Sequence, residues 1–218
     1  MNSPSRLGFY LRKLHSLSGV LPLGAFLVEH IWTNAHALAG ENAFTGAVLD
    51  LQKIPFLPVI EIFGILLPLL FHSFYGIAIT LAGKQNLVRY NYARNWLYVL
   101  QRVSGVLVLL FVLYHLWEFR VQKWLYGMAV ESFYSILSAH LSATVMGVPL
   151  GAMGYLLGLL ATVFHFSNGM TGFCMAWGIT VSREAQVRAN WLFAALGIVL
   201  FGIGAATVLH FATGVRPF

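Results

Sequence analysis

The stretch VLVLLFVLYHLWEF, residues 106–119, places one histidine, His115, inside an otherwise apolar run. An imidazole in hydrocarbon must find a partner or lose its charge, because an unpaired buried polar group costs a few kcal/mol. Ionisable residues inside membrane-spanning segments are therefore candidates for a functional role. The same pattern occurs four times in this sequence, at His30, His72, His115 and His165.

The composition indicates an integral membrane protein. Of the 218 residues, 59% are hydrophobic and 9% are charged, whereas a soluble domain carries about 25% charged residues. A helical span needs about 20 apolar residues, so the chain can form roughly five spans. We predict an all-α bundle of five transmembrane helices, forming a single membrane-anchor domain over residues 1–218. The spans are expected at about 17–37, 59–82, 98–119, 148–175 and 191–213.

Cysteine content and charge exclude several classes of protein. A single cysteine, Cys174, excludes an intrachain disulfide and a cysteine-rich metal site. The C-x-x-C-H motif that attaches haem covalently does not occur. The sequence pI near 9.7 could suggest nucleic-acid binding, but the positive charges separate by membrane side instead.

This separation of charge orients the predicted bundle. Nine positive residues fall on one side: Arg6, Arg12, Lys13, Lys84, Arg89, Arg94, Arg102, Arg183 and Arg188. Four fall on the other: Lys53, Arg120, Lys123 and Arg216. Because cytoplasmic loops carry the excess of Lys and Arg, we expect a cytoplasmic N-terminus, an outer C-terminus and a multi-pass position in the inner (cytoplasmic) cell membrane. We expect an interfacial helix around 130–145, and a short polar link at 41–56.

A two-helix unit is repeated along the chain. Span one reads LSGVLPLGAFLVEHIW (17–32) and span three reads VSGVLVLLFVLYHLW (103–117). Both carry S-G-V, and both end in H-x-W. Span one has one extra residue and also Pro22, which can kink the helix and absorb the mismatch. Spans two and four share F-H-x-x-x-G, in LFHSFYG and VFHFSNG. We therefore interpret spans one and two as a repeat of spans three and four.

This repeat predicts how the histidines pair. His30 and His115 are expected near the outer ends of spans one and three, about 24–27 Å from the inner face at the helical rise. His72 and His165 are expected about 16–20 Å from that face. Residues at equal depth can meet, so His30 should face His115 and His72 should face His165. Two bis-histidine sites, stacked across the bilayer between the first four helices, result.

A pair of facing neutral imidazoles suits a six-coordinate b-type haem. Gly76 and Gly169 lie four residues after a histidine on the same helix face, where a flat macrocycle can lie against the helix. Gly19 and Gly105 could serve likewise, nearly three turns before the histidines of their own spans. Zinc would need three or four ligands, and a proton relay of histidines would not need the glycines. We predict two haem b groups, with iron bound by His30, His72, His115 and His165.

The remaining histidines receive weaker interpretations. His15 lies at the inner mouth beside Ser16 and Arg12, and these three residues are candidates for holding haem propionates, which need donors and positive charge. The alternative is that they are simple interfacial residues. Solvated surface histidine is the favoured interpretation of three others: His36, His140 and His210.

The phrases LRKLHSLSGV, RNWLYVLQRVSG, YHLWEFRVQ and FHFSNGMTGFCMAWGIT, with the four histidines, resemble one family over nearly the whole chain. The chain is similar to the dihaem cytochrome b anchor, of the type with one large five-helix subunit, of succinate dehydrogenase and fumarate reductase. The resemblance implies a flavoprotein and an iron–sulfur partner subunit on the cytoplasmic side, with the dicarboxylate chemistry in the flavoprotein. A dimer of such complexes is common in the family.

The resemblance also implies an electron route and a quinone. Electrons would pass between the iron–sulfur subunit, the inner haem at His72 and His165, the outer haem at His30 and His115, and menaquinone. Family members carry a glutamate near the outer haem that serves the quinone. Glu61 is the candidate here, as a proton donor or acceptor. The alternative is a solvated carboxylate at a helix N-terminus, where the helix dipole favours it.

One position departs from the pattern of some dihaem fumarate reductases. These enzymes carry a glutamate two residues before the ligand in span four, thought to carry protons across the membrane. This chain has Val163 there, so we do not expect that proton route.

Two other functions fit the residues less well. One is a haem-binding docking anchor without its own quinone site. The other is a haem-free membrane transporter with a histidine relay, which would show no visible haem absorbance.

Overall fold

The computed structural model describes residues 6–84 and 86–215. These residues form helices and loops, with one isolated β-bridge between Val145 and Val148 and no β-strand among them. Five helical segments in this part of the chain are long and apolar enough to cross a membrane: Arg6–Ala39, Leu57–Ala82, Ala93–Tyr126, Leu150–Ala176 and Arg183–Thr213. The all-α class and the five spans are confirmed. Arg216, used above for orientation, lies outside the described residues.

Three of these segments are longer than their apolar stretches. The first begins at Arg6, the third at Ala93 and the fifth at Arg183, although we expected the spans to start at 17, 98 and 191. The added turns are rich in charged and amphipathic residues. Such side chains can lie along apolar surface while their charged ends reach water, so the helix continues past the point where the apolar run stops.

Irregular turns interrupt the first three segments. The first consists of α1 (Arg6–Val20), α2 (Pro22–Ala35) and the 3-10 helix η1 (His36–Ala39). Its break at Leu21 directly precedes Pro22, where a kink was expected. The second consists of α4 (Leu57–Val59), the π-helix η2 (Ile60–Leu66) and α5 (Leu67–Ala82).

The third segment consists of α6 (Ala93–His115), the π-helix η3 (Leu116–Val121) and α7 (Gln122–Tyr126). The fourth and fifth are single helices, α9 (Leu150–Ala176) and α10 (Arg183–Thr213). Single π-helical turns are frequent at functional sites. His115 lies directly before one of them and Glu61 lies inside the other.

By its internal contacts the chain divides into two compact units. Unit 1 comprises Met1–Leu27, Pro58–Val106 and Phe164–Gly197, and unit 2 comprises Val28–Leu57, Leu107–Val163 and Ile198–Phe218. Each predicted histidine pair falls within one unit: His72 and His165 in unit 1, and His30 and His115 in unit 2.

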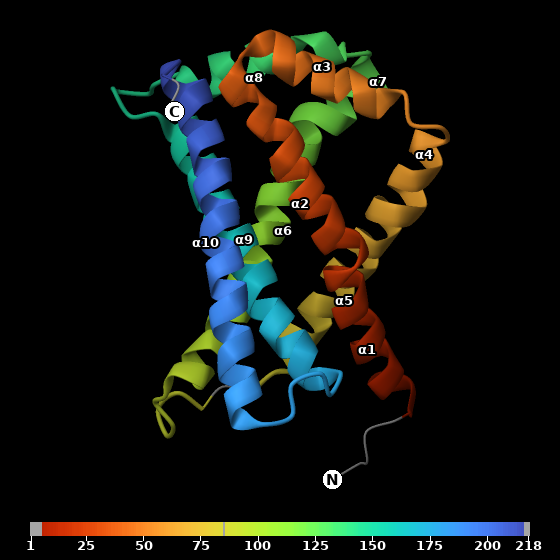
Figure 1. The fold of residues 1–218 in the computed structure, drawn as a ribbon, viewed down its shortest axis with the longest axis vertical. Helices are drawn as coiled ribbons and strands as arrows, with labels where there is room; N and C mark the ends of the chain where they lie inside the picture. The colour runs from red at the N-terminus through yellow and green to blue at the C-terminus, as the bar shows by residue number, and fades with distance from the viewer. Residues whose placement is uncertain (1–5, 85, 216–218) are drawn as a thin grey trace. The chain divides into compact units, whose positions relative to one another are not determined.

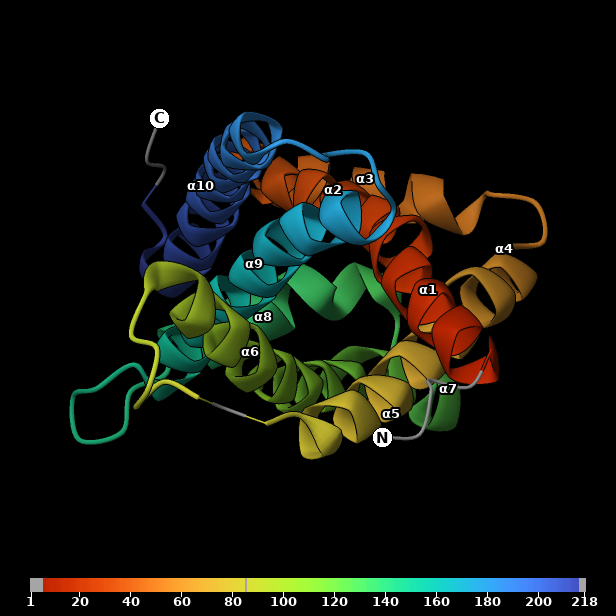
Figure 2. The same ribbon diagram turned by 90° about the horizontal axis from the view of Figure 1, so that it is seen from below.

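In unit 1, α1 contacts α5, and Figures 1 and 2 show that the two helices cross at an angle. Lys13 of α1 donates a hydrogen bond to the carbonyl oxygen of Ala176, at the end of α9, and its ammonium group lies 4.8 Å from the ring centre of Trp177. Arg94 of α6 donates to Gln186 of α10 at 2.7 Å. These contacts tie the helices together at one end of unit 1.

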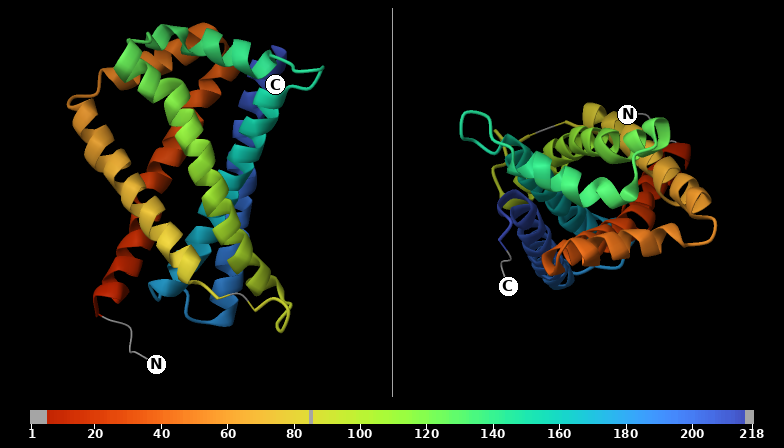
Figure 3. Two further views of the ribbon diagram at one scale, coloured as in Figure 1. Left: turned by 180° about the vertical axis from the view of Figure 1, so that it is seen from behind. Right: turned by 90° about the horizontal axis from the view of Figure 1, so that it is seen from above.

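Unit 2 contains an apolar core and two short helices. The helix α3 (Glu41–Gln52) packs against α8 (Phe133–Ser142), and both are seen from above in Figure 3. A 3-10 turn, η4 (Val130–Ser132), leads into α8. The core is formed by Ala37, Phe44, Phe119, Leu137, Leu141, Ala152, Tyr155, Val208 and Phe211. The helix expected around 130–145 is confirmed as α8.

The prediction of a short polar link at 41–56 is wrong, because residues 41–52 form α3. Phe44, Val48 and Leu51 recur at the spacing of one helix face. Phe44 is only 2% exposed, and Val48 packs against the same core. The segment is an amphipathic helix, and the neighbouring polar residues concealed its periodicity.

Candidate functional site

The first histidine pair lies in unit 1. His72 projects from α5 and His165 from α9. Their ring centres are 6.2 Å apart, with the ring planes at 88°. The structure brings together His72 and His165, the two residues whose pairing was predicted from their equal depth.

Backbone carbonyl groups fix the orientation of both rings. The Nδ1 atom of His72 lies 3.0 Å from the carbonyl oxygen of His15, and the Nδ1 atom of His165 lies 3.0 Å from that of Gln101. A carbonyl oxygen can only accept, so each Nδ1 carries the proton and donates it. The lone pair of each Nε2 atom is then left for a metal, as in metal sites where the second ring nitrogen is held by an oxygen acceptor.

The repeat seen in the sequence recurs as two matching sets of contacts in unit 1. Ser18 donates to the carbonyl oxygen of His15 at 2.9 Å and lies 3.4 Å from Nδ1 of His72. Its counterpart, Ser104, donates to the carbonyl oxygen of Gln101 at 3.1 Å and lies 3.2 Å from Nδ1 of His165. The serine of the S-G motif in span one therefore lies beside the histidine of span two. The serine of the motif in span three lies beside the histidine of span four in the same way.

The glycines of these motifs lie directly against the rings. A Cβ atom at Gly19 would overlap the ring of His72, and one at Gly105 would lie 2.9 Å from Cε1 of His165. The structure places Gly19 against His72 and Gly105 against His165, because the missing side chain lets an imidazole from the crossing helix approach the backbone. Packing of a macrocycle against these two glycines stays a prediction.

Gly76 and Gly169 also occupy matching positions. A Cβ atom at Gly76 would lie 3.0 Å from Nε2 of His15, and one at Gly169 would lie 3.3 Å from Nε2 of Gln101. His15 therefore faces Gly76 with its side chain and holds His72 with its carbonyl group. Gln101 faces Gly169 and holds His165 in the same way. Packing of a macrocycle against these glycines remains a prediction.

The three propionate candidates all lie on α1. His15 stacks on His72, with ring centres 4.1 Å apart and planes at 9°. Ser16 donates to the carbonyl oxygen of Lys13 at 2.9 Å and accepts from Nε1 of Trp177 at 3.0 Å, while Arg12 is exposed. The structure therefore brings His15 to the histidine pair, and a role for the three residues in binding propionates stays a prediction.

Sequence reasoning missed the polar residues that surround His165. The Nε2 atom of Gln101 lies 3.2 Å from Nδ1 of His165, and Asn168 donates to Oε1 of Gln101 at 2.7 Å. Gln101 occupies the repeat position of His15, so the shared S-G motif was a signal that could have identified it.

The second pair lies in unit 2. The ring centres of His30, on α2, and His115, at the end of α6, are 5.7 Å apart, with planes at 77°. The hydroxyl oxygen of Tyr155 lies 3.2 Å from Nδ1 of His115 and donates its own proton to Oε2 of Glu118. Since that proton is committed to the carboxylate, the tyrosine oxygen accepts from His115 and leaves Nε2 of His115 for a metal.

Both pairs fit a b-type haem. A metal–imidazole bond is about 2 Å long and each ring centre lies about 1 Å behind its nitrogen, so one metal separates two ring centres by roughly 6 Å. The separations of 6.2 and 5.7 Å agree with this value. Within the described ranges no three or more His, Cys, Asp or Glu side chains gather as a metal site. Each pair would therefore supply two axial ligands to an iron whose other four ligands come from the porphyrin.

One histidine interpreted as solvated is buried, and another is half-buried. His210 is only 4% exposed, and its Nε2 and Nδ1 atoms lie 3.1 Å from the hydroxyl oxygen of Tyr134 and the carbonyl oxygen of Val215. The His140 side chain is 29% exposed, and its Nδ1 atom contacts Oε1 of Glu118. Packing between distant segments sets both environments, which no local pattern reveals.

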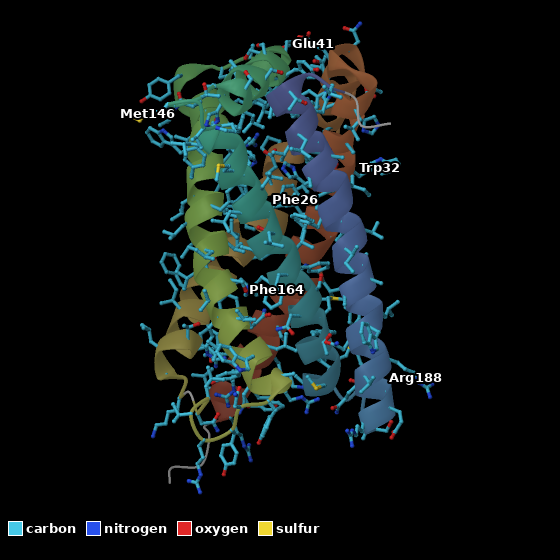
Figure 4. All side chains as sticks on the ribbon, turned by 90° about the vertical axis from the view of Figure 1, so that its left-hand side faces the viewer. Phe26, Trp32, Glu41, Met146, Phe164 and Arg188 are labelled. Carbon is cyan, nitrogen blue, oxygen red and sulfur yellow. The ribbon has the colours of Figure 1, made fainter. Side chains whose placement is uncertain are left out.

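Three other residues are placed as follows. Glu61 lies half-buried in η2 within unit 1. Val163, at the position of the fumarate reductase glutamate, is buried. Trp32 is 66% exposed, and Figure 4 shows it pointing away from the helices. Such exposure is typical of an aromatic residue in an interfacial belt.

These features define a class of protein: a helical membrane subunit with two histidine pairs. A family model described as "Succinate dehydrogenase/Fumarate reductase transmembrane subunit" matches residues 80–204, more than half of the chain, so the chain belongs to this family. It is 40% identical over 203 residues to the "Succinate dehydrogenase cytochrome b558 subunit" of Bacillus subtilis (strain 168), covering 93% of this chain and 96% of the relative. A search of solved structures gave no significant match.

Proposed function

We propose that this chain is the dihaem cytochrome b anchor of a succinate:quinone or quinol:fumarate oxidoreductase. One observation carries the proposal: two histidine pairs have ring-centre separations that suit a shared metal, and Nδ1 is held by an oxygen acceptor in His72, His165 and His115. His72 and His165 would bind one haem b and His30 and His115 the other. The name of the Bacillus subtilis relative, a cytochrome b558 subunit, supports the haem type.

When bound, the two haems would supply one-electron carriers between an iron–sulfur subunit and menaquinone. The chain's own residues hold and orient the axial imidazoles, through carbonyl groups in unit 1 and through Tyr155 in unit 2. The flavoprotein and iron–sulfur partners would dock on the cytoplasmic side, to which the positive-inside rule assigns the N-terminus. Dicarboxylate chemistry would occur in the flavoprotein.

Four further assignments complete the proposal. Glu61 would exchange a proton with the quinone, because a change of quinone redox state requires one. His15, Ser16 and Arg12 would face the propionates of the haem in unit 1. The membrane would be the inner cell membrane of a bacterium, with a dimer of complexes as the expected assembly.

A spectrum of the purified complex tests the proposal. The expected result is a reduced-minus-oxidised difference spectrum with the α-band of b-type haem, a haem assay giving two haems per chain, and succinate-driven reduction of menaquinone. A preparation without haem that supports transport would favour a histidine relay. Haem with no quinone turnover would favour a docking anchor.

A further inference from the structure

Two loops of unit 2 lead directly into membrane-spanning segments. Residues 53–56 connect α3 to α4, and residues 143–149 connect α8 to α9. The segments that follow, spans two and four, are counterparts in the sequence repeat. Figures 1 and 3 show both loops reaching sideways from the end of unit 2 at which α3, α7 and α8 lie.

Each loop contains a tight turn in which a residue with a side chain has a positive φ. In the described part of the chain, the non-glycine residues with positive φ are Phe56, at 57°, and Met146, at 52°. A Cβ atom makes this left-handed conformation unfavourable, so glycine or asparagine normally occupies it. Strain of this kind persists only where the surroundings compensate for it.

The turn at Phe56 has the pattern of a type II turn. The backbone N–H of Leu57 donates to the carbonyl oxygen of Ile54 at 3.2 Å, with Pro55 in the second position and Phe56 in the third. Proline is common in that second position, and the third requires positive φ, hence glycine or asparagine. Phe56 is 80% exposed, so its ring gains little contact with the protein in exchange.

The turn at Met146 is a two-residue hairpin turn. Val145 and Val148 exchange backbone hydrogen bonds of 2.9 and 3.0 Å, and both central residues, Met146 and Gly147, have positive φ. This is the pattern of a type I′ turn, for which Asn-Gly is the preferred sequence. Methionine stands in the asparagine position, and its side chain is fully exposed. Both loops therefore depart from the expected turn residue in the same direction, toward a large apolar side chain.

The sequence around both turns is apolar and uncharged. No Asp, Glu, Lys or Arg occurs in residues 54–60 or in residues 143–149. The charge nearest to Phe56, on Lys53, is paired with Asp50 at 2.6 Å. Water does not stabilise exposed phenylalanine or methionine, whereas transfer of such a side chain into an apolar environment is favourable.

The apolar surface of each turn continues into that of a membrane-spanning segment. Val59 and Ile60, at the start of span two, are exposed, and so is Leu150, the first residue of α9. Trp124 and Tyr126 of α7 are exposed at the same end of unit 2. Such aromatic residues are typical of the boundary between membrane and water, so the loops lie near that boundary.

We propose that the turns at Phe56 and Met146 insert their apolar side chains into the lipid bilayer, at the boundary between head groups and acyl chains. The leaflet is the one at this end of the helices, which the positive-inside rule assigns to the outer side. Transfer of both side chains into lipid compensates for the strained backbone and holds unit 2 at a fixed depth. The inference does not depend on haem or quinone binding.

Spin labels at the two turns provide the first test. In the complete complex, in nanodiscs of phosphatidylcholine and phosphatidylglycerol, Cys174, which is buried, is replaced by Ala. A nitroxide is then attached in Phe56→Cys or in Met146→Cys. Glu41→Cys on α3 is the water reference and Ile198→Cys, at the middle of α10, is the lipid reference, because both residues are exposed. The collision rate with oxygen, which enters lipid, is compared with that of a water-soluble nickel chelate.

The oxygen-to-chelate ratio at both turns should shift from the Glu41 value toward the Ile198 value. A ratio equal to the Glu41 value at either turn would overturn the inference, because the side chain would then face water. Low collision rates with both reagents, together with dipolar broadening between labels, would show contact with a second copy of the chain. That result would also overturn it.

A polar substitution that suits both turns provides the second test. Phe56→Asn combined with Met146→Asn removes the backbone strain but also removes the apolar side chains. We expect the Tm of the complex in nanodiscs to fall by roughly 2–4 °C or more, the shift typical of a modest destabilisation in a chain of this size. Val88→Asn is the control for a polar replacement of an exposed valine outside these loops. An unchanged or raised Tm in the double variant would overturn the inference.

Photolabelling of the unmodified complex provides a third test that needs no substitution. A phospholipid that carries a diazirine near the glycerol end of one acyl chain is added to the nanodiscs and photolysed. Mass spectrometry should find label on the peptides that contain Phe56 and Met146, and none on the exposed face of α3. Labelled spans two and four with neither loop labelled would contradict insertion of the turns.

Discussion

The imidazole of His72 packs directly over Gly19, so closely that a Cβ atom at residue 19 would overlap the ring. The contact joins the S-G motif of α1 to the histidine of α5, and Gly105 repeats it with His165. A backbone without a side chain at this point lets the ring reach the carbonyl oxygen that holds Nδ1. The geometry of the histidine pair therefore depends on a glycine in another helix.

Substitution of Gly19 by Ala should remove the haem of the His72–His165 pair selectively. The added Cβ atom displaces the ring of His72 from its carbonyl partner, whereas the pair in unit 2 is untouched. Haem content should fall to about half, because one of two axial pairs is lost, and a redox titration should show one remaining component. Gly172→Ala is the control, since a Cβ atom there meets nothing within 4 Å. Retention of both haems in Gly19→Ala would contradict this account.

Substitution of each axial histidine should sort the four residues into two groups. His72→Ala and His165→Ala should abolish the same haem, and His30→Ala and His115→Ala should abolish the other. The reason is that a bis-histidine haem loses its coordination when either ligand is removed. Redox titration of the four variants measures this. Loss of the same component in His30→Ala and His72→Ala would show that the pairing is wrong.

Replacing Tyr155 with Phe should raise the midpoint potential of the haem bound by His115. The tyrosine oxygen accepts a hydrogen bond from Nδ1, which makes the imidazole more basic and favours oxidised iron. A hydrogen bond of about 0.5–1.5 kcal/mol corresponds to roughly 20–60 mV for one electron. The other haem provides an internal control in the same titration. An unchanged or lowered potential would indicate that Tyr155 does not tune this ligand.

Replacing Glu61 with Gln should slow quinone turnover about a hundredfold if this carboxylate exchanges protons with the quinone. The amide keeps the shape of the side chain and removes its ability to titrate. Steady-state quinone reduction, normalised to haem content, measures the effect. Quinone turnover at the wild-type rate would return Glu61 to its alternative interpretation, a carboxylate favoured by the N-terminal end of its helix.

Features that depend on the order of residues along one helix could be predicted from the sequence. The five spans follow from runs of apolar residues, and the break before Pro22 follows from its missing N–H group. Helix α3 was missed because Phe44, Val48 and Leu51 lie in a segment with several polar residues that is too short to span a membrane. The apolar residues of this segment do recur at helical spacing, but its overall composition resembles that of a polar loop.

Partners from distant segments could not be predicted in the same way. The sequence predicted no role for Glu118, yet it accepts a hydrogen bond from Tyr155 and contacts Nδ1 of His140. These three residues come from η3, α9 and α8, and no spacing relates them. This polar cluster therefore became visible only in the folded chain.

The sequence by itself determined five apolar helices, four histidines inside them, and a repeat whose shared positions are Ser18 with Ser104 and Gly19 with Gly105. Hydrophobicity and helical spacing are properties of a single segment, so they survive without tertiary information. Only the tertiary structure decided which glycine meets which histidine and which tyrosine holds His115. Such contacts depend on how neighbouring helices cross and rotate, and side-chain packing between segments far apart in the chain sets both.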